Sequence, residues 1–249
     1  MKHPLLLKAM GVVIALFLWQ IVASSHVLGD DFGSSFSPVN ALTSLFHLAL
    51  SGDLAKQAVP SLKRIFVGMT AATFLGVIVG IVIGLYGSIQ YLTYMPFQFI
   101  RMTSPLAWMP IAIILLGIGD RPVYFLIAVA AVWPVIINTY SGVKRVSRIW
   151  IEVIKTLGGN DWLVLTKVIV PAIIPYVMTG LKVAVGISWI ILVPAEMLGV
   201  SSGLGYFILD CRDRFSYDEM MAVILVIGMI GLILDSLIGI LQDHYNWSL

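Results

Sequence analysis

The chain has few charged residues and a single cysteine. Asp, Glu, Lys and Arg make up 11% of its 249 residues, whereas about 25% is usual in soluble domains. The lone Cys211 excludes an intramolecular disulfide and a metal site built from cysteines. A net charge of only +2 gives no reason to expect nucleic-acid binding. Hydrophobic residues, by contrast, make up 59% of the chain, so most of it is expected to lie in a lipid membrane.

The sequence also lacks the patterns of an enzyme active site. Its four histidines lie in the tails or in outer segments, and no HExxH, Ser/His/Asp or paired-acid arrangement occurs. Gly158-Gly159 is not followed by the Lys-Ser/Thr of a phosphate-binding loop, so the chain is not expected to bind ATP itself. No catalytic, cofactor-binding or metal-ligating residue is predicted, and a membrane-embedded enzyme is the least favoured interpretation.

Six stretches are apolar and long enough to cross a bilayer, which takes about 20 residues per helix. Because lipid offers no partners to backbone groups, these stretches must be helices. The predicted fold is an all-α polytopic membrane protein with about six transmembrane helices in one domain, residues 1–249. The predicted spans are roughly Leu5–Ala23, Ile65–Tyr86, Met95–Ile118, Val123–Tyr140, Ile173–Leu198 and Met220–Leu241.

The domain divides into three parts by hydropathy. Residues 1–25 form the first span, which is expected to be retained because no small-residue cleavage site follows it. Residues 26–62 are expected to lie outside the membrane core, with an interfacial helix that starts at Ser37-Pro38 and ends at Ser51-Gly52-Asp53. A solvated loop is the alternative for this helix. Residues 63–241 hold the core spans.

The orientation follows from basic residues in short loops. A dense cluster, residues 144–148, abuts the end of one span and is expected to be cytoplasmic, which places both termini in the cytoplasm. The cluster leads into a polar island between Glu152 and Gly180. Leu157-Gly158-Gly159 is expected to turn the chain sharply there. Residues 142–172 therefore form a cytoplasmic loop that interrupts the spans.

The island resembles the EAA loop of ABC-transporter permeases. Glu152, Gly158 and Pro171 stand at matching places, with Leu157 before the glycine, while Val153 and Ile154 replace the two alanines. Three further segments resemble the nitrate/sulfonate/taurine/bicarbonate branch of binding-protein-dependent inner-membrane permeases. The matching residues, within residues 60–240, are Arg101, Pro105, Leu106, Pro110, Gly117, Gly119 and Asp120; Asn138, Gly142 and Val143; and Glu196-Met197-Leu198 with Gly203-Leu204-Gly205-Tyr206.

This resemblance implies a type I importer permease in the bacterial plasma (inner) membrane, which carries a small anion: nitrate, bicarbonate, cyanate, or a sulfonate such as taurine. It implies a second permease chain, expected to be identical, two cytoplasmic ABC ATPase subunits that hold ATP and Mg, and an outer solute-binding protein. A secondary transporter or channel subunit without an ATPase is the alternative. The residues expected to couple the loop to the ATPase are Glu152, Leu157, Gly158, Gly159, Asp161 and Pro171.

Charged residues within spans are costly and are treated as functional candidates. The candidate pathway residues are Arg101, Met102, Met109, Lys182, Trp189 and Glu196. Prolines around Arg101 are expected to kink or break its span. The alternatives are pairing of Arg101 with Glu152 or a span-end carbonyl, snorkelling of Lys182 to the membrane surface, and plain packing for each methionine.

Overall fold

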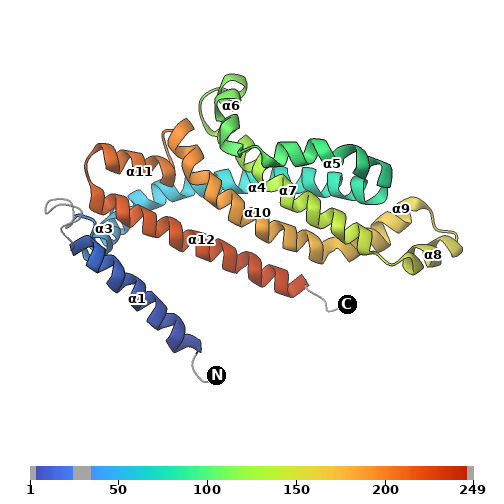
Figure 1. Ribbon diagram of the computed structural model, residues 1–249, viewed down its shortest axis with the longest axis horizontal. Coiled ribbons are helices and arrows are strands. Elements are labelled where there is room, and N and C mark those ends of the chain that lie inside the picture. Colours follow the sequence, from blue (N-terminus) through green and yellow to red (C-terminus); the bar gives the residue numbers. More distant parts are fainter. Residues whose placement is uncertain (1–3, 25–34, 246–249) are drawn as a thin grey trace.

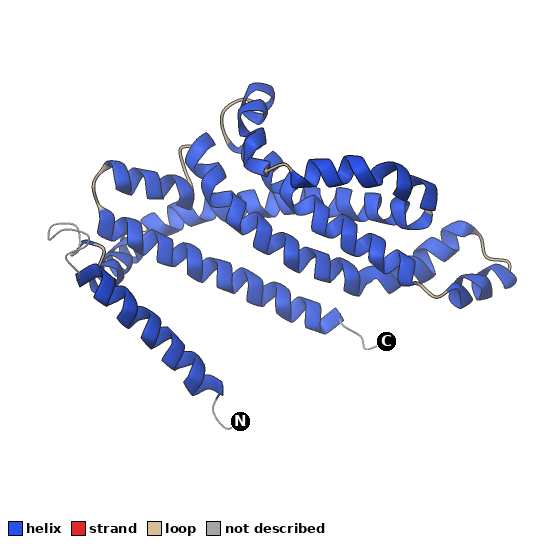
Figure 2. Cartoon of the chain, viewed as in Figure 1, coloured by secondary structure: helices blue, strands red, loops and turns tan. Residues whose placement is uncertain are grey.

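The computed structural model describes residues 4–24 and 35–245, and within these ranges every regular element is a helix (Figure 2). The predicted all-α fold is confirmed. The elements are α1 (Pro4–Ser24), α3 (Pro38–Ser51), α4 (Asp53–Leu85), α5 (Gly87–Met102), the 3-10 helix η2 (Pro105–Trp108), α6 (Met109–Leu116), α7 (Asp120–Arg145), α8 (Arg148–Thr156), α9 (Asp161–Val164), the π-helix η3 (Leu165–Ile169), α10 (Val170–Gly199), α11 (Leu204–Asp213) and α12 (Tyr217–Tyr245).

Four long helices, α4, α7, α10 and α12, form the body of the molecule and lie side by side (Figure 1). Each is long and apolar enough to cross a membrane, and α10 continues α9 and η3 as one unit of 39 residues. The loop that contains α8 lies at one end of this body, and α11 lies at the other (Figure 1). These are called the α8 end and the α11 end. The shorter α1 covers the first predicted span and leans away from the body (Figure 1).

The third predicted span, Met95–Ile118, is two helical units. α5 and the unit formed by η2 and α6 are bent 87° relative to each other. The break lies at Ser104, whose backbone is extended (φ −60°, ψ 126°) because Pro105 follows it. The predicted kink is therefore confirmed, but the predicted start of the span is wrong, since α5 begins at Gly87.

The helix predicted in the outer segment is α3, and local chemistry sets its ends. The Ser37 hydroxyl accepts a hydrogen bond from the backbone N–H of Asn40 at 3.2 Å and caps the start. Gly52 ends the helix in the left-handed conformation, with φ 78°. Because α4 already begins at Asp53, well before the predicted Ile65, residues 53–62 belong to the same helix as the second span.

Glycines bring α4 and α7 into close contact along their length. A Cβ built at any of four α4 glycines would lie only 2.5 to 2.8 Å from the nearest side-chain carbon of α7. Small residues of this kind let membrane helices approach closely and gain dispersion contacts. The contacts are Gly68 against Ile127, Gly76 against Val135, Gly80 against Thr139, and Gly84 against Val143.

Candidate functional site

The segment between α7 and α10 folds into a tight loop at the α8 end. After α8, Gly158 has a φ of 81°, in the left-handed region that favours glycine. Gly159 is needed for space, because a Cβ there would lie 2.5 Å from Cγ2 of Ile154. Asn160 then caps α9 by accepting a hydrogen bond from the N–H of Leu163 at 2.9 Å. The predicted sharp turn is confirmed, and its two glycines serve different purposes.

α8 has an inner face that anchors the loop and an outer face that lies open. On the inner face, Ile151 and Ile154 pack against a small buried cluster from α7, α9, η3 and α10. The outer face lines a shallow groove of about 290 Å³, in which Leu157 is 79% exposed. Exposed apolar side chains beside a carboxylate are typical of a docking surface for another protein. This outer groove is lined by Ile149, Glu152, Val153, Thr156 and Leu157.

Asp161 and Pro171 lie outside the outer groove. Asp161 forms an ion pair with Lys155 across the turn at 3.3 Å, and both side chains are exposed. Exposed pairs of this kind contribute little to stability. Of the six loop residues predicted from the sequence, the structure thus brings Glu152 and Leu157 into the groove and places Gly158 and Gly159 in the turn beside it.

The π-helical segment η3 joins the loop to α10 without a break. It ends two residues before Pro171, whose ring would clash with the carbonyl of Lys167 in a regular α-helix. The wider π turn relieves this conflict, and such turns are frequent at functional sites. Because α9, η3 and α10 form one continuous unit, the loop is joined directly to a spanning helix.

A central cavity of about 470 Å³ lies between α5, η2, α7 and α10. Its α7 residues, from 129 to 138, are in the middle of that helix, so the cavity is about halfway along the body. α10 contributes Val183, Ile187 and Ile191, which are spaced one turn apart on one face. Arg101 lines this cavity, and no carboxylate does.

Arg101 brings an uncompensated charge to the central cavity. Its Nη2 donates to Oε1 of Gln98 at 2.9 Å, and it forms no ion pair with a described carboxylate. The alternative pairing with Glu152 is therefore absent from the structure. Across the cavity, Nδ2 of Asn138 donates to the carbonyl of Pro134 at 2.8 Å. The site combines one cation with an amide and the Thr103 hydroxyl in mostly apolar surroundings, which suits a small anion.

The two methionine candidates lie near the bend between α5 and α6. Met102 is 67% exposed and follows Arg101 directly, without lining the cavity. Met109 is buried, and its Cε lies where a Cβ at Gly199 would be. Met109 therefore packs the start of α6 against the end of α10.

Lys182 and Trp189 lie where α10 meets α12. Nε1 of Trp189 donates to the carbonyl of Ile227 at 3.1 Å and so ties the two helices together. The ammonium of Lys182 lies 3.6 Å from the position of a Cβ at Gly239 of α12. Neither residue lines the central cavity.

Glu196 belongs to a buried ionic network at the α11 end. Its Oε1 accepts from Nη1 of Arg64 at 2.6 Å, and its carboxylate also accepts from the Ser61 hydroxyl and the N–H of Gly205, at 2.8 and 2.9 Å. Arg64 donates further to Oδ1 of Asp120, at 2.9 Å from Nε and 2.7 Å from Nη2. Arg64 and Glu196 are 1% and 0% exposed. The network joins α4, α7, α10 and α11.

Arg64 is a buried residue of this network that the sequence analysis does not single out. Taken only as a charge between the outer segment and the second span, it would be expected to be exposed, like Lys63. Since α4 starts at Asp53, Arg64 instead lies inside a packed helix, while Lys63 faces outward. The sequence does offer one signal for its burial. Arg64 stands at the start of an apolar run, and acidic residues stand at the ends of other spans, where they could pair with it. Among the described residues, no cluster of His, Cys, Asp and Glu is arranged to hold a metal ion.

Comparison with known proteins agrees with these features. Residues 72–247 match the family described as binding-protein-dependent transport system inner membrane component. The chain belongs to this family, the permeases of ABC importers, and is a multi-pass inner-membrane protein. This confirms the family indicated by the sequence motifs.

Relatives with similar sequences cover nearly the whole chain. The bicarbonate transport system permease protein CmpB of Synechococcus elongatus is 33% identical, over 96% of this chain and 88% of its own. The nitrate import permease protein NrtB of Synechocystis is 32% identical, over 94% and 87%. A putative ABC transporter permease protein of Methanocaldococcus jannaschii is 34% identical, over 97% and 91%.

A solved structure shows the same fold. A chain of the inward-facing MetNI methionine ABC transporter superposes with a TM-score of 0.63 at 15% identity, over 77% of this chain and 93% of that one. The type I ABC importer permease fold is therefore confirmed.

Proposed function

We propose that the chain is the permease subunit of an ATP-driven importer and forms the pathway for a small oxyanion of the bicarbonate or nitrate kind. In this proposal a second, identical chain completes the pathway. Two ATPase subunits, which hold ATP and Mg, bind at the α8 end, and a solute-binding protein docks at the α11 end. The α8 end and both termini then face the cytoplasm.

The central cavity is the observation that carries the anion assignment. Its single charge is the guanidinium of Arg101, and no carboxylate lines it. Half the depth of the membrane is where importers and other transporters expose polar groups to solute. Two relatives of this chain are named for bicarbonate and nitrate. One uncompensated cation gives a weak attraction, which is sufficient when a binding protein selects the solute.

The outer groove of α8 supports the assignment of the ATPase contact. Glu152 offers a carboxylate to a basic partner residue, and Leu157 presents an exposed apolar side chain. The buried cluster under α8 holds this surface firmly against the body. η3 and α10 then connect it to residues that line the central cavity. A displacement of the groove residues by an ATPase subunit would therefore be transmitted along the continuous chain to the residues that line the central cavity.

The α11 end supports docking of a binding protein. Ser201 is exposed, and a mixed-charge stretch follows on α11. Within it Arg212 pairs with Asp213 at 2.8 Å, and Arg214 pairs with Asp210 at 3.0 Å, all of them partly exposed. Such pairs exchange partners at low cost and favour transient, salt-sensitive contacts.

The test is uptake of labelled bicarbonate, nitrate and taurine into proteoliposomes that carry the whole complex. Arg101→Gln is expected to slow anion uptake by about tenfold, the effect of roughly 1.4 kcal/mol, while basal ATP hydrolysis persists. Arg121→Gln is the matched control, since Arg121 is an exposed cation at the start of α7, away from the cavity.

Three outcomes separate the alternatives. If Arg101→Gln and Arg121→Gln slow anion uptake equally, Arg101 has no specific role in the pathway. Transport of only neutral or cationic solutes contradicts the anion assignment and leaves the permease assignment standing. Uptake that needs an ion gradient but no ATPase favours a secondary transporter.

A further inference from the structure

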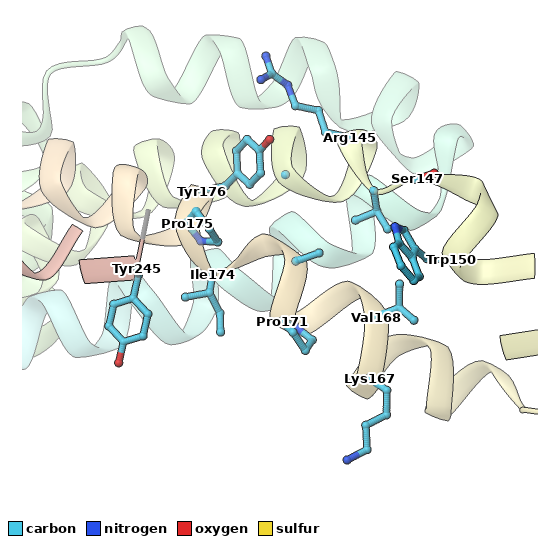
Figure 3. Close-up of a pocket in the computed structure, with 13 residues that line it drawn as sticks. Arg145, Ser147, Trp150, Lys167, Val168, Pro171, Ile174, Pro175, Tyr176 and Tyr245 are labelled. Carbon is cyan, nitrogen blue, oxygen red and sulfur yellow. The ribbon is translucent and has the colours of Figure 1, made fainter. Parts of the chain in front are cut away.

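A second cavity, of about 610 Å³, opens at the α8 end and takes no part in the outer groove or the central cavity (Figure 3). It lies between the last turn of α7, the start of α8, η3 and the start of α10. Tyr245, at the end of α12, closes one side. It is called the basic cavity below.

The lining of the basic cavity is amphipathic. Apolar residues form most of it, including five aromatic or proline residues, and Arg145 and Lys167 lie on opposite sides of these with their charged ends pointing apart (Figure 3). The guanidinium of Arg145 stands 5.7 Å from the centre of the Tyr176 ring, so this cation is held over the apolar lining. The aromatic and proline residues are Trp150, Pro171, Pro175, Tyr176 and Tyr245.

The charge around the basic cavity is positive. None of its lining residues is acidic. Lys144 and Arg148, both exposed, flank Arg145 in the sequence. The nearest acids along the chain point elsewhere: Glu152 lines the outer groove, and Asp243 is exposed without lining the cavity. A ligand of this cavity is therefore anionic at one end.

The position of the basic cavity limits the ligand further. It lies where the spanning helices α7, α10 and α12 end, which is the depth of lipid headgroups. Trp and Tyr are enriched at this depth, and basic pockets between spanning helices hold acidic headgroups. A soluble anion would leave the proline and aromatic walls without a partner. An anionic headgroup joined to an acyl chain satisfies both parts of the lining.

We propose that the basic cavity binds an acidic phospholipid from the leaflet at the α8 end. Its negative headgroup is attracted by Arg145 on one side of the lining and by Lys167 on the other, and an acyl chain follows Ile174 and Pro175 toward the membrane. Lys167 belongs to η3, so the lipid touches the segment that joins the loop to α10. This proposal concerns the permease chain itself and does not depend on the solute that it carries.

The experiment counts lipids bound to the full-length chain in detergent by native mass spectrometry. Dioleoyl phosphatidylglycerol is compared with dioleoyl phosphatidylcholine, and soluble glycerol phosphate supplies the headgroup without acyl chains. The wild-type chain is expected to retain phosphatidylglycerol at about tenfold lower concentration than phosphatidylcholine. Arg145→Gln and Lys167→Gln are each expected to weaken phosphatidylglycerol binding about fivefold, the share of one cation near a membrane surface.

Lys144→Gln is the matched control. Lys144 directly precedes Arg145 on α7, and its ammonium lies over the Tyr140 ring outside the cavity. Ala172→Phe fills the cavity without changing any charge and is expected to weaken binding of both lipids. The proposal is overturned if wild type holds both lipids equally, if Lys144→Gln acts as strongly as Arg145→Gln, or if glycerol phosphate displaces the lipid at equal concentration. The comparison of lipids on wild type stands even if a variant fails to fold.

Discussion

At the scale of single residues, Arg64 organises the α11 end. Besides Glu196 and Asp120, it donates to the carbonyl and hydroxyl oxygens of Ser202, at 2.7 and 2.9 Å. One buried guanidinium thus fixes three helices and the loop before α11. Buried charges are costly to desolvate, and removal of one partner leaves the other uncompensated. The network therefore matters more for the arrangement of this end than for net stability.

Arg64→Met is expected to destabilise the chain by about 3 to 5 kcal/mol, because it strands the carboxylate of Glu196 in the core. Arg64→Met combined with Glu196→Leu is expected to be less damaging than Arg64→Met alone. Thermal unfolding of the full chain in detergent measures this. The control is Lys56→Gln, which removes an exposed pair with Asp53 at the same end. Equal unfolding temperatures for Arg64→Met and Lys56→Gln would contradict the role of the network.

Gly158 is required for its backbone conformation and not for space, because a Cβ there would meet nothing within 4 Å. Substitutions should therefore rank by their tolerance of a positive φ. Gly158→Asn is expected to be mild, Gly158→Ala to cost about 1 kcal/mol, and Gly158→Val to be worst. Retention of ATPase subunits during purification gives the measurement. Gly186→Ala, in open space within α10, is the control. A loss that follows side-chain size alone would contradict this explanation.

Cys211 is expected to be inert toward maleimides. Burial, reinforced by the negative charge of Glu219, raises the pKa of its thiol to about 12. Only about one thiol in a thousand is then ionised at pH 9, and the thiolate is the reactive form. Labelling should stay low from pH 7 to 9, whereas Ser201→Cys, exposed at the same end, should label readily. Rapid labelling of the wild-type chain would show that the α11 end opens.

At the scale of elements, the α4 and α7 pair depends on glycine. Gly76→Leu would force a side chain into Val135, which lies 2.8 Å from the built Cβ. Overpacking of this kind costs about 1 to 3 kcal/mol. Gly228→Leu is the same change in α12, with nothing within 4 Å. We expect a lower unfolding temperature in detergent for the first variant and no change for the second. If both variants have the same unfolding temperature, α4 and α7 must lie further apart than they do in the structure.

Local signals predicted most elements but not their long-range partners. The cap at Ser37 and the turn at Gly158 follow from short-range chemistry, so both were predictable. The bend at Ser104 was predictable from its prolines, but its 87° angle depends on packing against α7 and α10. Arg64 was not singled out because hydropathy records a charge and not its distant carboxylates. The central cavity was found only through Arg101, since its other walls are ordinary apolar residues.

At the scale of the whole molecule, the two ends of the body differ in character. The α8 end exposes apolar side chains beside basic residues, and the α11 end exposes paired charges. This asymmetry predicts the orientation in the membrane. Thr156→Cys, in the outer groove, should react with a membrane-impermeant maleimide only after permeabilisation of cells that express the chain without its ATPase subunits. Ser201→Cys should react in intact cells. Buried Cys211 can stay in both variants, and the reverse pattern would invert the proposed orientation.

The glycine contacts between α4 and α7 also limit how the molecule can move. Each glycine of α4 sits against a branched side chain of α7, so neither helix can slide or turn without lifting out of a row of interlocked contacts. The two helices therefore move as one rigid unit, which extends from the ionic network at the α11 end to the loop at the α8 end. When the pathway changes state, the hinges must lie elsewhere, at the junctions of the α4 and α7 pair with α5 and α10.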